Sequence, residues 1–406
     1  MSHESSSSES ESSDSVVFSP RAPVDQSTLL QNRYLIKRSL GKGAFGKVFE
    51  AWDKHSKETV AIKISKSSLQ RNAKREVQAL KELQALENGF VVKILDHFEW
   101  QGRICIVMEY LSKNLYQVLR ETGHKGLSLA CVKMFGWQLL MALSLLEVPG
   151  LIHCDLKPEN IMLKSPDMAG IKLIDFGSSS KATERLCRYV QSRYYRAPEV
   201  LLELPYGSAV DIWSVGCILA ELHTGRPLFY GTDSSDQLAK IVELKGTPPH
   251  NMIKKSLRGF QIFDLRNFQL LTVNNPKHNS VAELIEKNSS WAEDPFEFKS
   301  FLDLLEKMLV YDPKDRLTPQ EALRHPFFSD LNSSLEGKVL TSYKNTEENL
   351  HETKEDYSPY SKLSTAMDSS HFQPPRQNSC ISYQNSLQKK TYFNRPSSQE
   401  TNVHSM

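Results

Sequence analysis

The sequence lacks a strong excess of either charge and has few cysteines. Its 50 Lys and Arg residues nearly balance 48 Asp and Glu residues, for a formal net charge of +2 at pH 7. Such a chain has no basic field that would favour nucleic acid or an anionic membrane as its main partner. The six cysteines among 406 residues show no paired spacing, which excludes a disulfide-stapled scaffold and leads us to expect reduced thiols.

Targeting signals and membrane spans are also missing from the pattern. The first residues do not combine a basic region with an apolar stretch, as a secretory signal would. We find no apolar run that approaches the roughly 20 residues of a membrane span. We therefore expect a monomer without membrane contact, located in the cytoplasm, the nucleus or both.

Large apolar residues are scarce at both ends of the chain. Residues 1–32 are rich in Ser, Asp and Glu, and residues 329–406 are rich in Ser, Asn, Gln, Lys and Thr. These compositions bury too little apolar surface to offset the entropy lost on folding, so we expect two disordered arms. The chain as a whole is 39% hydrophobic and 24% charged, enough for one two-lobed domain or two ordinary ones.

Between the arms, the pattern changes from strands to helices. Alternation of apolar and polar positions predicts strands at residues 34–48, 59–64, 91–98 and 104–109. Apolar residues at helical spacing predict one helix among them, at residues 69–86. The first part of the domain should therefore be a small antiparallel sheet with a single helix.

Longer apolar segments follow and are typical of buried helices. They lie at residues 127–146, 210–222, 301–309 and 319–323. Thr318 before Pro319 has the pattern of a helix start, with a capping hydroxyl and proline at the first helical position. The sequence therefore predicts an α+β fold of two lobes within residues 33–328, a sheet lobe at 33–110 and a helical lobe at 111–328.

Three glycines stand close together in the first predicted hairpin, in the string Gly41-Lys42-Gly43-Ala44-Phe45-Gly46. Because glycine has no Cβ, Gly41, Gly43 and Gly46 would let backbone N–H groups approach the phosphates of ATP, with Phe45 as a lid. Alone, the string reads more readily as an ordinary glycine hairpin. Val48 behind it and the strand ending at Lys63 favour the phosphate-binding loop.

Lys63 ends the pattern Val-Ala-Ile-Lys, where a strand lysine can contact the α- and β-phosphates of ATP. Its ammonium needs an anion to hold it. We predict Glu76 as that partner, because Leu80 one helical turn later can pack inward on the same face. Glu82 and Glu87 are the competitors, and we expect both to be solvated.

The string His153-Cys154-Asp155-Leu156-Lys157-Pro158-Glu159-Asn160 combines a carboxylate, an ammonium and an amide in one short loop. Asp155 would orient an acceptor hydroxyl and accept its proton. Lys157 would neutralise charge on the γ-phosphoryl group, and Asn160 would ligate Mg²⁺ through its amide oxygen. A plain polar surface turn does not account for the full string.

Asp175 follows an apolar run that predicts a buried strand. Its carboxylate can bind Mg²⁺ at the strand end, and Gly177 lets the chain turn away. We expect His153 and Phe176 to support these loops by packing, without a chemical role.

The segment 178–199 ends at Ala197-Pro198-Glu199. This string is typical of the end of the activation segment in enzymes that transfer a phosphoryl group from ATP to proteins. We expect Glu199 to be buried and paired with Arg316, which would fix this segment to the helical lobe. A surface arginine is the alternative.

Residues 34–328 resemble a eukaryotic protein kinase of the CMGC group, and within it the dual-specificity tyrosine-regulated (DYRK) family. The resemblance is carried by four strings: His153-Cys154-Asp155, Asp175-Phe176-Gly177-Ser178-Ser179, Gln191-Ser192-Arg193-Tyr194-Tyr195-Arg196 and Leu222-His223-Thr224-Gly225-Arg226-Pro227-Leu228-Phe229. It implies a bilobal kinase that uses ATP and Mg²⁺ and phosphorylates Ser and Thr in protein substrates.

Family membership further implies autophosphorylation of an activation-segment tyrosine, which here is Tyr189. Arg193 and Arg196 match the arginines that clamp this phosphate in the family. A clamp on the segment itself also explains why Cys154 can replace the more usual arginine. An ordinary exposed or packed tyrosine is the alternative.

The resemblance also implies the residues that line the nucleotide site. Besides the glycine loop and Lys63, these are Val48, Ala61, Met108, Glu109, Leu111, Asn160, Met162 and Asp175. Met108 occupies the gatekeeper position, where this family usually has Phe, so the back pocket should differ in shape.

Other departures from the family leave its subdivision open. Cys187 stands where the family has a first activation-segment tyrosine, and no acidic box precedes the glycine loop. Homeodomain-interacting kinases share several of the strings and are the alternative. Residues 247–291 occupy the place of the group's insert, a docking element, so docking partners could bind there or on the two arms.

Two rival functions belong to other classes. A pseudokinase scaffold would be free to lose Lys63, Glu76, Asp155, Asn160 or Asp175, yet all five are present. A small-molecule kinase of the same fold fits poorly, because the segment up to Glu199 builds a platform for a protein substrate. We therefore predict an active protein kinase.

Overall fold

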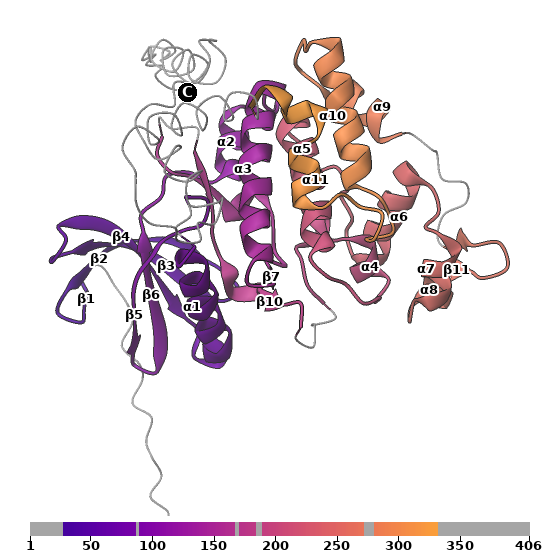
Figure 1. Cartoon of the computed structure of the whole chain (residues 1–406). Coiled ribbons are helices and arrows are strands. Elements are labelled where there is room, and N and C mark those ends of the chain that lie inside the picture. The colour runs from indigo at the N-terminus through magenta and orange to yellow at the C-terminus, as the bar shows by residue number, and fades with distance from the viewer. Residues whose placement is uncertain (1–26, 87–88, 167–169, 184–188, 272–279, 332–406) are drawn as a thin grey trace, which may run out of the picture.

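The computed structural model describes residues 27–86, 89–166, 170–183, 189–271 and 280–331. A lobe built on a sheet lies at one side of the molecule, and a mostly helical lobe lies at the other (Figure 1). The predicted α+β fold of two lobes is confirmed. The rest of both arms, together with Cys187 and Cys380, lies outside the described residues.

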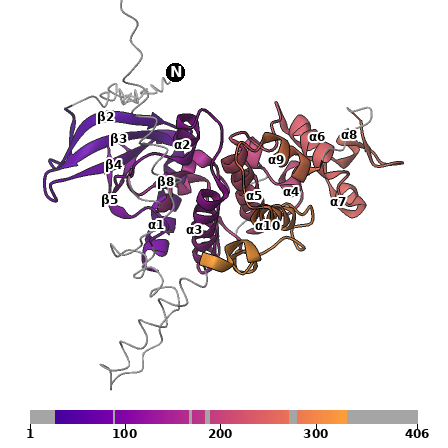
Figure 2. The ribbon, with the colours of Figure 1, turned by 90° about the horizontal axis from the view of Figure 1, so that it is seen from above.

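The sheet of the first lobe has six antiparallel strands in the order β1-β2-β3-β4-β6-β5. They are β1 (Leu29–Leu30), β2 (Tyr34–Lys42), β3 (Gly46–Asp53), β4 (Glu58–Ser65), β5 (Ile94–Trp100) and β6 (Arg103–Glu109). The predicted helix is α1 (Gln70–Gln84), which packs against β5 and β6 and lies next to β5 in Figure 2. Strand β1 corrects the expected arm at residues 1–32, because Leu30 is fully buried and its pairing with Tyr34 adds it to the sheet.

Side chains of β4 alternate between the two faces of the sheet, as the period of a strand requires. Val60, Ile62 and Ile64 join a cluster formed within the sheet lobe. Lys63 lies between them in sequence and so points to the opposite face. That face carries Ile106 of β6 and belongs to the larger cluster, which includes α1 and the helical lobe. The strand register thus places Lys63 between the two lobes.

The helical lobe is built around two long buried helices that the sequence predicted. Its helices are α2 (Leu115–Glu121), α3 (Leu129–Glu147), α4 (Pro198–Leu201), α5 (Ala209–Thr224), α6 (Ser234–Lys245), α7 (His250–Lys255), α8 (Gly259–Ile262), α9 (Val281–Asn288), α10 (Pro295–Met308) and α11 (Pro319–Leu323). Helix α3 packs against α5 and α11, and α5 packs against α10. Thr318 caps α11 as predicted, since its side chain accepts a hydrogen bond from the N–H of Glu321.

Helix α3 overturns the expectation that no segment is long and apolar enough to span a membrane. Among the described residues it is the one helix that meets both criteria. It lies in the middle of the molecule (Figure 1). Of its 18-residue apolar stretch, 83% is buried inside the protein. A core helix of a globular lobe meets the same criteria, so α3 is accounted for by packing.

Short strands and 3₁₀ turns carry the loops between the lobes. The strands are β7 (Leu151–Ile152), β8 (Ile161–Leu163), β9 (Ile171–Leu173) and β10 (Ser180–Lys181), and the turns are η2 (Pro158–Asn160), η3 (Phe176–Ser178) and η4 (Arg193–Tyr195). Strand β7 pairs with β10, and β8 pairs with β9. These pairings bring residues 151–163 and 171–181 side by side.

The expected insert at residues 247–291 has its own small elements. Besides α7, α8 and α9 it contains the paired strands β11 (Phe263–Asp264) and β12 (Gln269–Leu270). Helices α7 and α8 lie at the end of the helical lobe farthest from the sheet (Figure 1).

Four cysteines fall within the described residues. Cys105, Cys154 and Cys217 are buried free thiols, as expected. Cys131 is disulfide-bonded, so the expectation of reduced thiols does not hold for this residue.

Candidate active site

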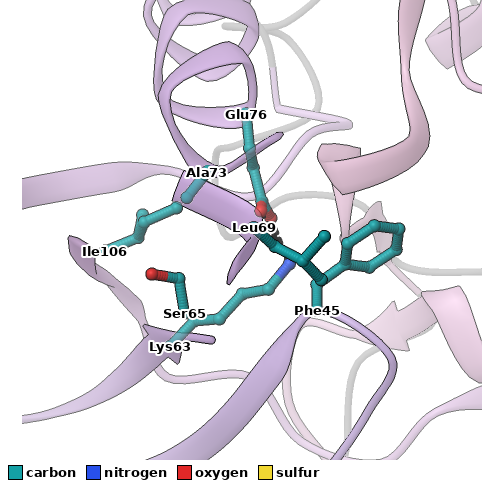
Figure 3. A pocket seen from close by; sticks show the side chains of 7 residues that line it. All are labelled: Phe45, Lys63, Ser65, Leu69, Ala73, Glu76 and Ile106. Atoms are coloured by element: carbon teal, nitrogen blue, oxygen red, sulfur yellow. Dashed lines mark hydrogen bonds and ion pairs between the residues drawn. The ribbon is translucent and has the colours of Figure 1, made fainter. Parts of the chain in front are cut away.

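Lys63 lies at the centre of a group of charged side chains between the lobes. Its ammonium donates to both carboxylate oxygens of Glu76, at 2.6 and 2.7 Å, and to Oδ1 of Asp175 at 2.7 Å. Figure 3 shows the side chains of Lys63 and Glu76 pointing toward each other. Burial alone would lower the pKa of Lys63, but the charges of Glu76 and Asp175 outweigh it and raise the pKa. Lys63 is therefore held as a cation.

Glu76 is the partner that the sequence predicted from its place on the helix. The competitor Glu82 is not simply solvated, because it pairs with Lys181 of β10 at 3.0 Å. Glu87 lies outside the described residues. The choice of Glu76 therefore agrees with the geometry, whereas the expectation for Glu82 was wrong.

Asp175 stands two residues after β9 in a left-handed conformation, with φ 63° and ψ 73°. Non-glycine residues adopt this conformation rarely and often at functional sites. Burial would raise the pKa of Asp175, but the nearby Lys63 charge dominates and lowers it, so the carboxylate is ionised. The fully buried rings of His153 and Phe176 pack edge to face at 4.9 Å, which confirms them as supports of the loops.

Asp155 holds its carboxylate in a fixed position between two segments. Oδ1 accepts from the backbone N–H of Ser192 at 3.1 Å and from its hydroxyl at 2.7 Å. Oδ2 accepts from Nζ of Lys157 at 2.8 Å, which also donates to the Ser192 hydroxyl at 3.1 Å. The side chain of Asp155 is 14% exposed. A carboxylate held this way can orient an incoming hydroxyl and accept its proton.

Asn160 and Asp175 fit the requirements of a magnesium site. The amide nitrogen of Asn160 donates to the backbone oxygen of Asp155 at 2.8 Å, which leaves the amide oxygen for a cation. Among the residues that the structure describes, no group of three or more His, Cys, Asp or Glu side chains could hold a metal. One amide and one carboxylate suit Mg²⁺, which usually takes its remaining ligands from water and substrate phosphates.

The glycine loop joins β2 to β3, and its glycines differ in what they meet. A Cβ on Gly41 or Gly43 would have no atom within 4 Å, which leaves their backbone open to a ligand. A Cβ on Gly46 would lie 2.2 Å from the carbonyl oxygen of Ile64. Gly46 is therefore required by the close approach of β4, and the prediction that it serves phosphate access needs this correction. Lys42 and Ala44 are exposed between them.

Phe45 is turned into the site, as expected of a lid. Its ring centre lies 5.5 Å from Nζ of Lys63, and its ring atoms lie 3.1 Å from the position of a Cβ on Gly177. It closes a small pocket behind Lys63 that Ser65, Leu69, Ala73, Glu76 and Ile106 also line (Figure 3). The glycine loop and the turn after Asp175 therefore touch across the site.

The strand register groups the predicted nucleotide-lining residues of the sheet. Val48 is paired with Lys63, and Ala61 is paired with Met108. Residues directly opposite in a ladder share a face, as do residues two apart on one strand. Val48, Ala61 and Met108 therefore lie on the face that carries Lys63, and Met108 is 8% exposed.

The remaining predicted lining residues lie where the chain passes between the lobes. The Glu109 carboxylate is paired with Nζ of Lys172 at 2.5 Å, so the side chain of Glu109 is engaged within the protein. Leu111 is 6% exposed, and Met162 lies on β8, half-buried. Their contact with ATP stays a prediction.

Two residues of the site were missed from the sequence, Ser192 and Asp211. Asp211 on α5 is 2% exposed and accepts from the backbone N–H groups of His153 at 2.7 Å and Cys154 at 3.1 Å. A carboxylate in the first turn of an apolar helix was a signal that could have found it, because a buried charge needs partners. Nothing in the sequence around Ser192 indicates its bond to Asp155.

The predicted phosphorylation site Tyr189 lies at the surface beside two arginines. It is 67% exposed, and the guanidinium carbon of Arg196 lies 4.1 Å from its ring centre. A hydrogen bond from Arg196 and then its charge lower the pKa of Tyr189, with a smaller effect from Arg193. Arg196 itself is only 3% exposed. The structure thus brings all three residues together, while Cys187 lies outside the described residues.

The activation segment is fixed at its end by the predicted ion pair. Nη1 and Nη2 of Arg316 donate to the two carboxylate oxygens of Glu199 at 2.9 and 3.0 Å. The residues are 4% and 1% exposed. This bidentate buried pair is confirmed.

Comparison with known proteins agrees with this geometry, since residues 34–328 match the family model described as protein kinase domain. The chain belongs to the protein kinase family. This kinase is 44% identical over 302 residues to serine/threonine-protein kinase ppk5 of Schizosaccharomyces pombe. It is 37% identical over 340 residues to dual specificity tyrosine-phosphorylation-regulated kinase 2 of Drosophila melanogaster. It is 38% identical over 312 residues to dual specificity tyrosine-phosphorylation-regulated kinase mbk-2 of Caenorhabditis elegans.

These alignments cover 73%, 81% and 72% of the kinase, but 36%, 46% and 38% of the relatives. The chain therefore spans less than half the length of these relatives. Its similarity to them places the kinase with the dual-specificity tyrosine-regulated family of the CMGC group, as the motifs predicted.

Proposed function

We propose that this kinase transfers the γ-phosphoryl group of ATP to Ser and Thr hydroxyls of protein substrates, and to its own Tyr189. The observation that carries the proposal is the Asp155 carboxylate held by Ser192 and Lys157, next to a complete Lys63–Glu76–Asp175 network. Catalysis of phosphoryl transfer depends almost entirely on positioning and charge. Both requirements are met by side chains that are already paired and oriented.

Each residue has one task in this proposal. Asp155 orients the acceptor hydroxyl and takes its proton, and Lys157 neutralises charge on the migrating group. Lys63 contacts the α- and β-phosphates, positioned by Glu76. Asn160 and Asp175 hold Mg²⁺, which supplies positive charge against the phosphate oxygens when bound.

The arginines beside Tyr189 support its phosphorylation. Arg196 is buried, yet its donors go to neutral groups, namely the carbonyl oxygens of Val190 and Gln191 and the hydroxyls of Ser234 and Tyr189. No carboxylate of the described residues is among its partners. A buried cation without an anion is costly, so a phosphate on Tyr189 would supply the missing charge. The names of the relatives, which include tyrosine-phosphorylation-regulated kinases, support the same assignment.

The remaining expectations are proposals of the same kind. We propose protein substrates and docking partners, the latter through residues 247–291 or the arms, for a monomer in the cytoplasm or nucleus. A pseudokinase scaffold gains no support from the site, because its five charged and amide groups are present and arranged together.

The substitution Asp155→Asn tests the enzyme directly. Transfer of label from [γ-³²P]ATP to a Ser- and Thr-containing protein should fall by roughly 10²–10⁴-fold in kcat, the contribution of a positioned acid or base. Binding of Mg²⁺·ATP should stay close to the parent value, because Asp155 does not contact the nucleotide in this proposal. A variant that turns over like the parent would refute the assigned base.

A further inference from the structure

Ser234, the first residue of α6, reaches the arginine that lies over Tyr189. Nη1 of Arg196 donates to Oγ of Ser234 at 3.1 Å. The hydroxyl of Tyr189 is itself hydrogen-bonded to both Arg196 and Ser234. A serine from a separate helix therefore stands at the atom that would carry the phosphate.

Arg196 is held in one orientation by the segment it belongs to. Its Nε donates to the carbonyl oxygen of Val190 at 2.9 Å, and its Nη2 donates to that of Gln191 at 2.8 Å. Nη1 is the nitrogen that remains for Ser234. The Arg196–Ser234 hydrogen bond is thus present in the unmodified protein, with the other two nitrogens of Arg196 held by backbone atoms.

Arg193 adds a second cation that is incompletely satisfied. Its Nη1 donates to the carbonyl oxygen of Gly231 at 3.4 Å, but its buried Nε has no hydrogen-bond partner among the described residues. A buried donor without an acceptor is costly. The surroundings of Tyr189 thus contain an unused donor on Arg193.

Two carboxylates flank Ser234 in sequence, and both are engaged elsewhere. Asp233 accepts from the N–H groups of Ser235 and Asp236 at 2.8 and 2.9 Å. Asp236 accepts from the N–H and hydroxyl of Thr232 at 2.8 and 3.0 Å. These bonds cap the first turn of α6 and fix Ser234 there. Their negative charge opposes an anion, so an anion held nearby needs direct donors.

A serine hydroxyl can serve an arginine and a phosphate at once. Oγ accepts from Arg196 through a lone pair, and its own proton, which reaches the Tyr189 oxygen in the unmodified protein, can be donated to a phosphate oxygen there. Hydrogen bonds to a charged acceptor are about twice as strong as neutral ones. Phosphate on Tyr189 would bring about −1.5 to −2 charge to this point.

We infer that Ser234 is a third group that holds the phosphate of Tyr189, donating its hydroxyl to a phosphate oxygen beside Arg193 and Arg196. The inference rests on the proposed phosphorylation of Tyr189 and concerns how the modified state is kept. This role of Ser234 makes α6 part of the phosphate site. The phosphate then joins the activation segment to a helix of the helical lobe.

The test compares how fast a tyrosine phosphatase removes this phosphate. The full chain is expressed in bacteria as parent, Ser234→Ala, Ser234→Thr and Ser235→Ala, and loss of phosphate from Tyr189 is followed by mass spectrometry without ATP. A phosphate must leave its site to be hydrolysed, so the rate follows the released fraction. We expect Ser234→Ala to lose phosphate roughly 5- to 10-fold faster than the parent.

The two other variants separate the hydroxyl from the fold of the helix. Ser234→Thr keeps a hydroxyl, and Ser235→Ala removes the next one along α6, so both should stay within about twofold of the parent. Equal rates for Ser234→Ala and the parent would overturn the role of Ser234 alone. Absence of phosphate from Tyr189 in the parent would overturn the proposed autophosphorylation and this inference with it.

Discussion

At the scale of single residues, Glu221 is a titratable carboxyl group buried in the core of the helical lobe. It is 4% exposed and accepts a hydrogen bond from the hydroxyl of Tyr195 at 2.7 Å. Burial raises the pKa of Glu221 to about 7, with the Tyr195 hydrogen bond opposing the rise and the charge of Glu159 adding to it. The carboxyl group is therefore half-protonated near neutral pH in the folded protein.

This raised pKa makes stability depend on pH in a defined direction. The folded state keeps the proton up to about pH 7, whereas the unfolded state releases it near 4.5. The stability that Glu221 contributes is thus complete below 4.5 and is lost as the pH rises toward 7. At about 1.4 kcal/mol per pH unit, the loss amounts to about 3 kcal/mol.

The substitution Glu221→Gln should remove this dependence while keeping an acceptor for Tyr195. Free energies of unfolding, measured with denaturant from pH 5 to 8, should shift in favour of the variant by about 2–3 kcal/mol across that range. The exposed residue Glu58 offers a control, since Glu58→Gln should follow the parent at every pH. A constant difference between parent and Glu221→Gln would contradict the raised pKa.

At the scale of elements, the glycine loop combines two requirements that the sequence does not distinguish. Gly46 sits where β3 begins, against the backbone of Ile64 in β4, while Gly43 faces open space. Gly46 is needed for the sheet, and Gly43 is the one that leaves access to the site. Both kinds look alike in the string.

Matched alanine variants separate these requirements. Gly46→Ala forces a Cβ against a carbonyl oxygen and should lower the free energy of unfolding by about 1–3 kcal/mol. Gly43→Ala should change it by less than about 0.5 kcal/mol, although it lies in the predicted phosphate loop. Thermal unfolding of both variants measures the difference. Equal losses of stability would argue against the close approach of β4.

The helices show which elements a sequence pattern can predict. Helices α3 and α5 were predicted because nearly every position is apolar. Helix α11 was predicted because Thr318 and Pro319 have the pattern of a helix start. Helix α10 begins at Pro295 rather than at residue 301, although Asp294 before Pro295 carries the same kind of start signal. Helix α6 was missed because its buried side chains are interleaved with polar ones, even though Asp233 caps it.

At the scale of the whole molecule, the site is assembled from segments far apart in the chain. Lys63 and Asp175 are 112 residues apart and meet at 2.7 Å. Their chemistry could be predicted because phosphoryl transfer needs those residue types in a fixed order. Contacts that depend on the way segments pack were not predictable from the pattern, and Ser192 on Asp155, Asp211 under His153 and Ser234 beside Arg196 are of this kind.

Two lobes with one network between them account for both proposed reactions. The buried pair of Glu199 and Arg316 fixes the end of the activation segment to the helical lobe, and Ser192 joins its middle to Asp155. Tyr189 precedes Ser192 by three residues. Ordering of the segment at Tyr189 would therefore help to fix the position of the proposed base, Asp155, and of the segment that binds the protein substrate.

The central claim is that the kinase phosphorylates its own Tyr189 with Asp155 as the base. Phosphopeptide mapping of the full chain expressed in bacteria tests it most directly, because the proposed self-modification needs no other kinase of this family. The parent should carry phosphate on Tyr189, and Asp155→Asn should carry none while remaining folded. An unmodified Tyr189 in the parent, or equal phosphate in the two proteins, would contradict the account.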